Sequence, residues 1–302
     1  MPTVQKPLKA RVIASFGRNF IAQCLDSEHH YQCYARGKRL GIAVGDYVLI
    51  TPQGQDQAVI EKTLERRNLL YRSDNQRSKL FAANIDLLLF IVASEPSFSL
   101  DLVGRAYVAA CNADIDMKIL LNKADLPQTE QAREKLQPLA AIGIPVVQTS
   151  ILAPEQLKQK LIPLLQGKTA LLLGQSAMGK SSILNVLVPD AQAQTQAHSA
   201  ALGAGRHTTT DTRLYHVNQA QASLIDSPGF QSFGLAHLER DELLKGFPDL
   251  HDAMQNCRFY NCTHRHEPSC GVVAAEKSGA IDPQRYQLYC RLLAELESRP
   301  LY

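Results

Sequence analysis

The sequence predicts a multidomain protein with an N-terminal β-barrel over residues 1–72, a central α/β domain over 73–246 and a small α-rich C-terminal domain over 247–302. Three observations support this division. Short β-rich runs fill the first 72 residues, apolar strands alternate with helical segments from residue 80 onwards, and cysteine and histidine cluster near the end of the chain. At 302 residues, the chain is long enough for two or three domains with their own cores.

The composition is that of a protein folded in water, with 45% hydrophobic and 20% charged residues. The N-terminal segment MPTVQKPLKARV lacks the apolar run of a signal peptide, and the longest apolar stretch, LLLFIVA from Leu87, is too short to span a bilayer. Seven cysteines, three of them clustered late, argue against a secreted disulfide framework. We therefore expect a cytoplasmic protein that binds no membrane and holds a metal with some of its cysteines.

The N-terminal domain reads as a small barrel. The β-rich runs KARVIASFG, NFIAQCL, HYQCYAR and DYVLITP are separated by turn residues, and QAVIEKTLERRNLLYR adds a fifth strand. This pattern predicts an OB-fold, although an SH3-like barrel would look similar in sequence. Residues 1–80 carry 13 basic and 7 acidic side chains, whereas the rest of the chain has a net charge of −3. The basic barrel is therefore a candidate RNA-binding face, the alternative being an ordinary solvated surface.

The central domain reads as a parallel, doubly wound sheet. The run NIDLLLFIVAS is apolar throughout, as expected of a strand that is buried on both faces. Alternating segments follow it: the helix LDLVGRAYVAACNA, the strand MKILLN, the helix TEQAREKLQPLAAIG, the strand PVVQTS, the helix PEQLKQKLIPLL and the strand KTALLLG. Ligands of such sheets bind beyond the carboxyl ends of the strands, so the loops that follow the strands are the candidate site.

The stretch GQSAMGKS follows the strand KTALLLG and matches the phosphate-binding pattern G-x-x-x-x-G-K-[ST]. The glycines let backbone N–H groups point at phosphate oxygens, Lys180 reaches the β- and γ-phosphates, and the Ser181 hydroxyl binds Mg²⁺. The alternative of a chance match is disfavoured by the strand before the loop and the helix SSILNVLV after it. The predicted phosphate-binding residues are Gly174, Gln175, Ser176, Ala177, Met178, Gly179, Lys180, Ser181 and Ser182.

The stretch LNKADLP carries a second motif, the guanine-reading pattern Asn-Lys-x-Asp at Asn122, Lys123, Ala124 and Asp125. The Asp125 carboxylate accepts hydrogen bonds from guanine N1–H and the N2 amine, neither of which adenine offers. Two such bonds give roughly 10²- to 10⁴-fold discrimination. Ser150, at the end of PVVQTS, is expected to place a backbone N–H near guanine O6. The alternative is a solvated turn, which the nearby phosphate loop makes less attractive.

A third motif, Asp-x-x-Gly, lies in LIDSPGF at Asp226 and Gly229, where Asp226 holds Mg²⁺ through water and the Gly229 N–H senses the γ-phosphate. Between it and the phosphate loop, GRHTTTDT offers Thr208, Thr209 and Thr210 as sources of a second Mg²⁺ hydroxyl. We include Thr209 in the predicted site, while the choice among the three stays open. The order base reader, phosphate loop, Thr loop, Asp-x-x-Gly is a circular permutation of the common GTPase order.

The segment CRFYNCTHRHEPSC places Cys257, Cys262, His264 and Cys270 in the spacing C-x₄-C-x-H-x₅-C. Three thiolates and one imidazole make a closed tetrahedral Zn²⁺ site of the structural type. His266 is a competing ligand, and free buried thiols are the alternative to any metal. Because four protein ligands leave no position for a catalytic water, a zinc hydrolase is disfavoured.

These motifs in this order resemble the ribosome small-subunit-dependent GTPases, the RsgA family, also called YjeQ or YloQ. The resemblance rests on NKAD, GQSAMGKSS, GRHTTT and DSPGF, with the barrel before them and the cysteine-rich segment after. It implies an OB-fold, a circularly permuted P-loop GTPase domain and a zinc domain. It also implies a GTP hydrolase, stimulated by the 30S subunit, that acts in late 30S maturation. The chain departs from the family at Ala177 and Met178, where Gly-Val is usual, and at DSPG, where Asp-Thr-Pro-Gly is frequent.

The resemblance further implies a monomer whose partners are GTP, GDP, the 30S subunit and its 16S rRNA. Ras-type enzymes orient the attacking water with a Gln after Asp-x-x-Gly, but this chain has Phe230 there, so intrinsic hydrolysis should be slow. His207 is the predicted catalytic residue, and similar proteins assign it that role. The alternative function is a nucleotide-gated rRNA-binding scaffold whose hydrolysis is incidental.

Overall fold

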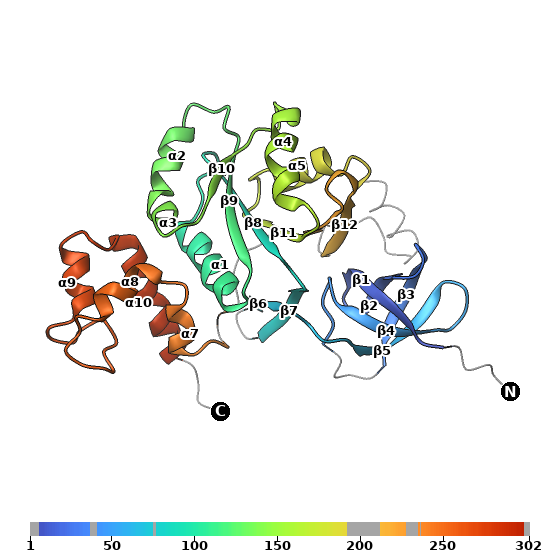
Figure 1. Cartoon of the computed structure of the whole chain (residues 1–302), viewed down its shortest axis with the longest axis horizontal. Coiled ribbons are helices and arrows are strands. Elements are labelled where there is room, and N and C mark those ends of the chain that lie inside the picture. The colour runs from blue at the N-terminus through green and yellow to red at the C-terminus, as the bar shows by residue number, and fades with distance from the viewer. Residues whose placement is uncertain are drawn as a thin grey trace.

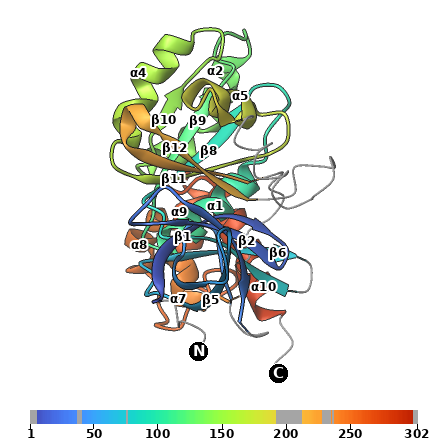
Figure 2. The ribbon, with the colours of Figure 1, turned by 90° about the vertical axis from the view of Figure 1, so that its right-hand side faces the viewer.

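The computed structural model describes residues 6–36, 41–74, 77–191, 212–227, 235 and 237–298. Figure 1 shows three parts, with the N-terminal barrel and the C-terminal helices on opposite sides of the central α/β domain. In the turned view of Figure 2, the central domain lies above the other two. His207, Thr208, Thr209, Thr210, Gly229 and Phe230 lie outside the described residues.

The barrel consists of β1 (Leu8–Phe16), β2 (Asn19–Cys24), β3 (His30–Ala35), β4 (Tyr47–Pro52) and β5 (Gln57–Thr63). Strand β1 pairs with both β2 and β4, which closes the sheet in the order β1-β2-β3-β5-β4. The one parallel pair is β3 with β5. This arrangement is the OB-fold, so the predicted fold is confirmed over the SH3-like alternative.

The hairpin β6 (Leu69–Asp74) and β7 (Arg77–Ala83) connects the barrel to the central domain. The run that was predicted to add one fifth strand therefore contributes β5 and the beginning of β6. Two separate strands form because the polar residues Glu65, Arg66, Arg67 and Asn68 interrupt the apolar pattern.

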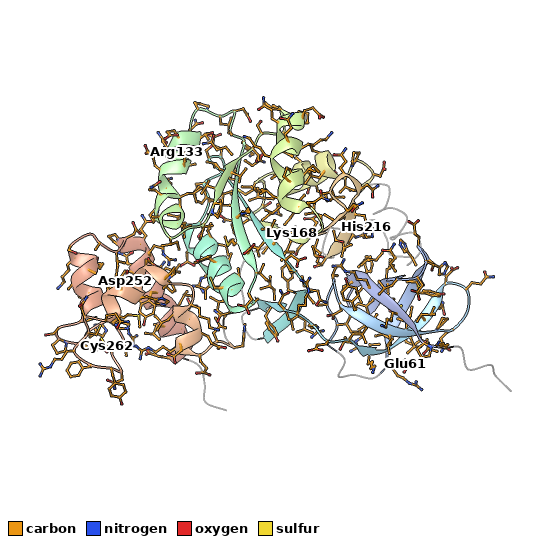
Figure 3. The ribbon with its side chains drawn as sticks, viewed as in Figure 1. Glu61, Arg133, Lys168, His216, Asp252 and Cys262 are labelled. Carbon is orange, nitrogen blue, oxygen red and sulfur yellow. The ribbon has the colours of Figure 1, made fainter. Side chains whose placement is uncertain are left out.

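The central sheet contains β8 (Leu87–Ala93), β9 (Asp116–Asn122), β10 (Val146–Gln148), β11 (Thr169–Gly174), β12 (Arg213–Val217) and β13 (Ala222–Asp226). Their order is β10-β9-β8-β11-β13-β12, and only β12 runs antiparallel. The sequence pattern did not indicate β12, a strand of five residues. It also pairs with β1 through Ala14 and Arg213, so the barrel and the central sheet are continuous. His216 of β12 lies beside the barrel (Figure 3), with Nε2 2.9 Å from Gln23 Oε1.

Helices cover both faces of the central sheet (Figure 1). Helices α1 (Leu100–Asn112), α2 (Thr129–Lys135) and α3 (Gln137–Ala141) lie on one face, whereas α4 (Pro154–Leu165) and α5 (Lys180–Leu187) lie on the other, and the 3₁₀ turn η1 (Asn218–Ala220) joins β12 to β13. All seven residues of β8 are buried, as the apolar run predicted. The helix predicted over residues 129–143 is divided at Leu136, because Pro138 lacks the N–H that a continuous helix requires.

The C-terminal domain consists of α7 (Arg240–Leu244), α8 (Pro248–Met254), α9 (Gly271–Lys277) and α10 (Pro283–Glu297). Helix α10 packs on α1 of the central domain so closely that a Cβ on Gly104 would lie 2.2 Å from Leu288 Cδ2. Ion pairs flank this contact. Arg105 binds Asp101 at 2.6 Å and Glu295 through both terminal nitrogens, and Arg291 binds Asp101 at 2.8 Å. No helix among the described residues is long and apolar enough to cross a membrane.

Candidate functional site

The three described motifs meet at one edge of the central sheet. Asn122 ends β9, Gly174 ends β11 and Asp226 ends β13. The parallel registers align these ends, since Ala93 of β8 lies opposite Asn122 and Leu172 of β11 lies opposite Asp226. The permuted order of the motifs along the chain therefore does not separate them in space.

The Asn122 side chain joins the base-reading loop to the phosphate loop. This side chain is 1% exposed, its Nδ2 donates to the Met178 carbonyl at 2.9 Å, and its Oδ1 accepts from Thr149 Oγ1 at 3.3 Å. Gly179 is required at this contact, because an added Cβ would lie 2.3 Å from Asn122 Nδ2 and because its φ is +94°. Asn122 thus fixes the distance between the two loops.

The base-reading loop leaves the Asp125 carboxylate exposed at the sheet edge. Its backbone is held by the Ala124 N–H, which donates to the Thr149 carbonyl at 3.0 Å, while Lys123 Nζ donates to the Glu95 carbonyl at 2.6 Å. The Ser150 hydroxyl donates to Asp125 Oδ1. We expected only a backbone contribution from Ser150, and this side-chain contact was missed because it joins residues on two different loops.

The phosphate loop curls around the Lys180 ammonium group. Lys180 Nζ donates to the Gly174 carbonyl at 2.7 Å and to the Gln175 carbonyl at 2.9 Å. Burial lowers the pKa of Lys180, whereas the nearby Asp226 carboxylate raises it. Helix α5 begins at Lys180, as predicted, so its first N–H groups face the anion position.

The remaining residues of the phosphate loop differ in exposure. Ser176, Ala177 and Ser181 are exposed, Ser182 is half-buried, and Met178 is 1% exposed in the core below the loop. Ala177 has a φ of +63°, a left-handed conformation that glycine adopts without strain. The alanine therefore costs the loop about 1–2 kcal/mol of backbone strain relative to the glycine that is usual in the family at this position.

Gln175 connects the phosphate loop to α1, a contact that the sequence did not indicate. Its Oε1 accepts from the Ser99 N–H at 2.7 Å. Ser99 is the N-cap of α1, where its Oγ accepts from the Leu102 N–H at 3.3 Å. The position of the phosphate loop and the start of α1 are therefore coupled through one residue.

The Asp226 carboxylate lies in a buried environment that suits the binding of a cation. Its Oδ1 is buried and has no hydrogen-bond partner among the described residues. Burial raises the pKa of Asp226, although the Lys180 ammonium group opposes this. A hydrated Mg²⁺ would satisfy the orphaned oxygen, so this residue fits its predicted role. Gly229, Thr209 and His207 lie outside the described residues.

The four predicted metal ligands come together in the C-terminal domain. The ligand atoms of Cys257, Cys262, His264 and Cys270 lie within 4.8 Å of one another. The sulfurs of Cys257 and Cys270 are 3.8 Å apart, and both face His264 Nδ1, at 3.4 and 3.7 Å. A tetrahedral zinc with bonds of about 2.3 Å would space its sulfurs by roughly 3.8 Å. His266 is exposed and lies outside the cluster.

The protonation of the cluster also fits a cation. Burial lowers the pKa of His264, which keeps its imidazole neutral and able to coordinate. Burial raises the pKa of the Cys262 thiol to about 12, so a thiolate there requires a compensating positive charge. The Glu267 carboxylate accepts from the Thr263 N–H at 2.7 Å and the Thr263 hydroxyl at 2.6 Å, which fixes the turn around His264.

Comparisons with known proteins agree with this geometry. The family model described as RsgA GTPase matches residues 63–236. The chain is 54% identical over 285 residues to the "Small ribosomal subunit biogenesis GTPase RsgA" of Bordetella pertussis, covering 94% of this chain and 95% of that protein. YjeQ from Thermotoga maritima has a similar crystal structure, with a TM-score of 0.72, 27% identity and coverage of 98% and 100%. YloQ, described as a circularly permuted GTPase, gives a TM-score of 0.68, 27% identity and coverage of 100% and 99%.

Asn122→Ala should weaken guanine-nucleotide binding by about 5- to 150-fold. The substitution leaves the Met178 carbonyl without its donor and releases the phosphate loop from the base-reading loop, at a cost of about 1–3 kcal/mol. Titration calorimetry with GDP measures the effect. Asn185→Ala, on the exposed side of α5, is the matched control and should bind as the wild type does. Equal affinity of both variants would contradict the bridging role of Asn122.

Proposed function

The chain belongs to the RsgA GTPase family, and we propose that it hydrolyses GTP in the late biogenesis of the small ribosomal subunit. The observation that carries this proposal is the convergence of Asp125, Lys180 and Asp226 on one sheet edge. The name of the Bordetella pertussis relative supplies the biological context. A scaffold with incidental hydrolysis is the second candidate, and the presence of Phe230 where Ras-type enzymes have a Gln favours testing it.

In this proposal each motif keeps the role that its chemistry suggests. Asp125 reads the guanine edge, and the N–H groups from Gly174 to Ser182 bind the phosphates. Lys180 turns from the Gly174 and Gln175 carbonyls to the β- and γ-phosphates. Ser181 and Asp226 would hold Mg²⁺, which would supply charge neutralisation at the transferring phosphate. Gly229 and Thr209 complete the γ-phosphate contacts, and His207 positions the attacking water.

The flanking domains provide the proposed contacts with the ribosome. The basic barrel, residues 1–72, binds 16S rRNA of the 30S subunit, and the C-terminal domain, residues 247–302, is stabilised by one Zn²⁺ held by Cys257, Cys262, His264 and Cys270. Residues 73–246 form the GTPase domain. The protein acts as a monomer in the cytoplasm, where the thiols stay reduced.

Turnover of GTP should rise by at least about tenfold when purified 30S subunits are added. The intrinsic rate should be slow because Phe230 cannot polarise water, so the subunit must complete the catalytic arrangement. Phosphate release with and without 30S subunits measures this. A GTP turnover rate that does not change when 30S subunits are added would favour the scaffold instead.

His207→Ala should lower the stimulated rate while GTP affinity stays within about twofold.

Asp125→Asn should weaken GTP binding and strengthen binding of xanthosine triphosphate. The amide can donate a hydrogen bond to the xanthine 2-oxo group, whereas it no longer accepts both guanine protons. Binding of the two nucleotides, each titrated into wild type and variant, gives the specificity ratio. An unchanged preference for GTP would remove Asp125 from the base-reading role.

Protein purified under reducing conditions should contain about one zinc per chain. Removal of the metal by a chelator should unfold the C-terminal domain first, because structural zinc contributes on the order of 10 kcal/mol or more to small sites. Atomic absorption gives the stoichiometry and hydrogen exchange of α10 reports the unfolding. His264→Ala should lose the zinc, whereas His266→Ala, outside the cluster, should keep it.

A further inference from the structure

The loop between Cys257 and Cys262, residues 258–261, exposes two aromatic rings. Tyr260 is 102% exposed and Phe259 is 39% exposed, although aromatic side chains of this size are usually at least half-buried. Figure 3 labels Cys262 at the outer end of the C-terminal domain, away from the central sheet. The Tyr260 ring is therefore fully open to solvent, and the Phe259 ring is partly so.

The loop is held in place at both ends. Cys257 and Cys262 belong to the metal cluster, the Arg258 N–H donates to the Ser269 carbonyl at 3.3 Å, and the Cys262 N–H donates to the Phe259 carbonyl at 3.2 Å. A ring presented on a fixed backbone loses little conformational entropy when a partner binds it. This arrangement is the one expected of a binding surface.

The charge around the loop favours an anionic partner. The Arg258 guanidinium lies over the Phe259 ring, 5.5 Å from its centroid, and Arg258 is exposed two positions before Tyr260 in the same loop. The sequence has no Asp or Glu between Asp252 and Glu267. Glu267 itself is occupied by N–H groups and the hydroxyl of its own turn. Asn256 and Asn261 add exposed amide groups, which suit base edges better than an apolar protein surface.

We propose that Tyr260 stacks on an unpaired base of ribosomal RNA while Arg258 binds an adjoining phosphate. The inference rests on the proposed function, since the small subunit is the source of the RNA. Exposed aromatic rings with a neighbouring Arg are the usual means by which proteins hold single-stranded RNA. A helix of a ribosomal protein would instead need a wider apolar surface than these two rings, which polar residues surround, can offer.

The test compares three substitutions at Tyr260 in the full-length protein. Binding to 30S subunits is measured by sedimentation with a non-hydrolysable GTP analogue. Tyr260→Ala should weaken binding by about 5- to 100-fold, the range for loss of one stacked base. Tyr260→Phe keeps the ring and should bind within about twofold of the wild type. Tyr260→Leu keeps the apolar area without a π-face and should behave like Tyr260→Ala.

Two controls make the result specific. Each variant should hold one zinc per chain and hydrolyse GTP at the wild-type intrinsic rate, which shows that the cluster and the GTPase domain are intact. A short oligoribonucleotide that contains 4-thiouridine, crosslinked by light to the wild-type protein, should label the peptide that carries residues 258–260. This measurement needs no ribosome, so it separates failure of the stacking from failure of the proposed function.

Wild-type affinity of Tyr260→Ala for 30S subunits, or no crosslink at residues 258–260, would overturn the proposal. Full binding by Tyr260→Leu together with loss in Tyr260→Ala would indicate a hydrophobic protein contact, which also overturns it. Absence of any 30S binding by the wild type would refute the proposed function, while the crosslink would still decide whether this loop stacks on RNA.

Discussion

The nucleotide-binding edge depends on the buried amide of Asn122. A circularly permuted chain brings the base-reading loop and the phosphate loop to the edge from segments in reversed order, so covalent connection does not set their spacing. The hydrogen bonds of Asn122 to Met178 and Thr149 set it instead, deep enough that water does not compete. Such contacts do not depend on the order of the two loops along the chain. The site therefore tolerates the permutation as long as β8 still pairs with β9 and β11.

Features encoded by local sequence were predictable, whereas those created by distant contacts were not. The buried strand β8, the turn that opens α5 and the spacing of the metal ligands each depend on a few neighbouring residues, and the structure bears out those local patterns. Strand β12 was missed because its five residues become a strand by pairing with β13 and β1. The contact of Gln175 with Ser99 crosses 76 positions of sequence, and no local pattern indicates it.

The cluster of Cys257, Cys262, His264 and Cys270 also depends on contacts that the local sequence does not indicate. Spacing alone left His264 and His266 as competing ligands. The backbone conformation places His264, and not His266, in the cluster. His264 has a φ of +61°, and the Glu267 carboxylate accepts hydrogen bonds from N–H groups of the same turn. The hydroxyl groups of Tyr286 and Tyr289 then bind the carbonyls of His264 and Thr263 at 2.9 and 3.1 Å. Helix α10 thus orients the ligand, which a reading of the segment Cys257–Cys270 cannot reveal.

The same helix connects the metal cluster to the nucleotide edge. Helix α10 packs against α1 at Gly104, and the N-cap of α1 is Ser99, whose N–H donates to Gln175 of the phosphate loop. The barrel is attached elsewhere, through the pairing of β1 with β12 and through Arg11, which donates to Thr169 at 2.7 Å and to Ser223 at 3.0 Å. The two flanking domains therefore contact different elements of the central domain, the helix α1 on one side and the strands of the sheet on the other. The phosphate loop is thus linked to the C-terminal domain through Ser99 and α1, whereas the end of β13 is linked to the barrel through β12.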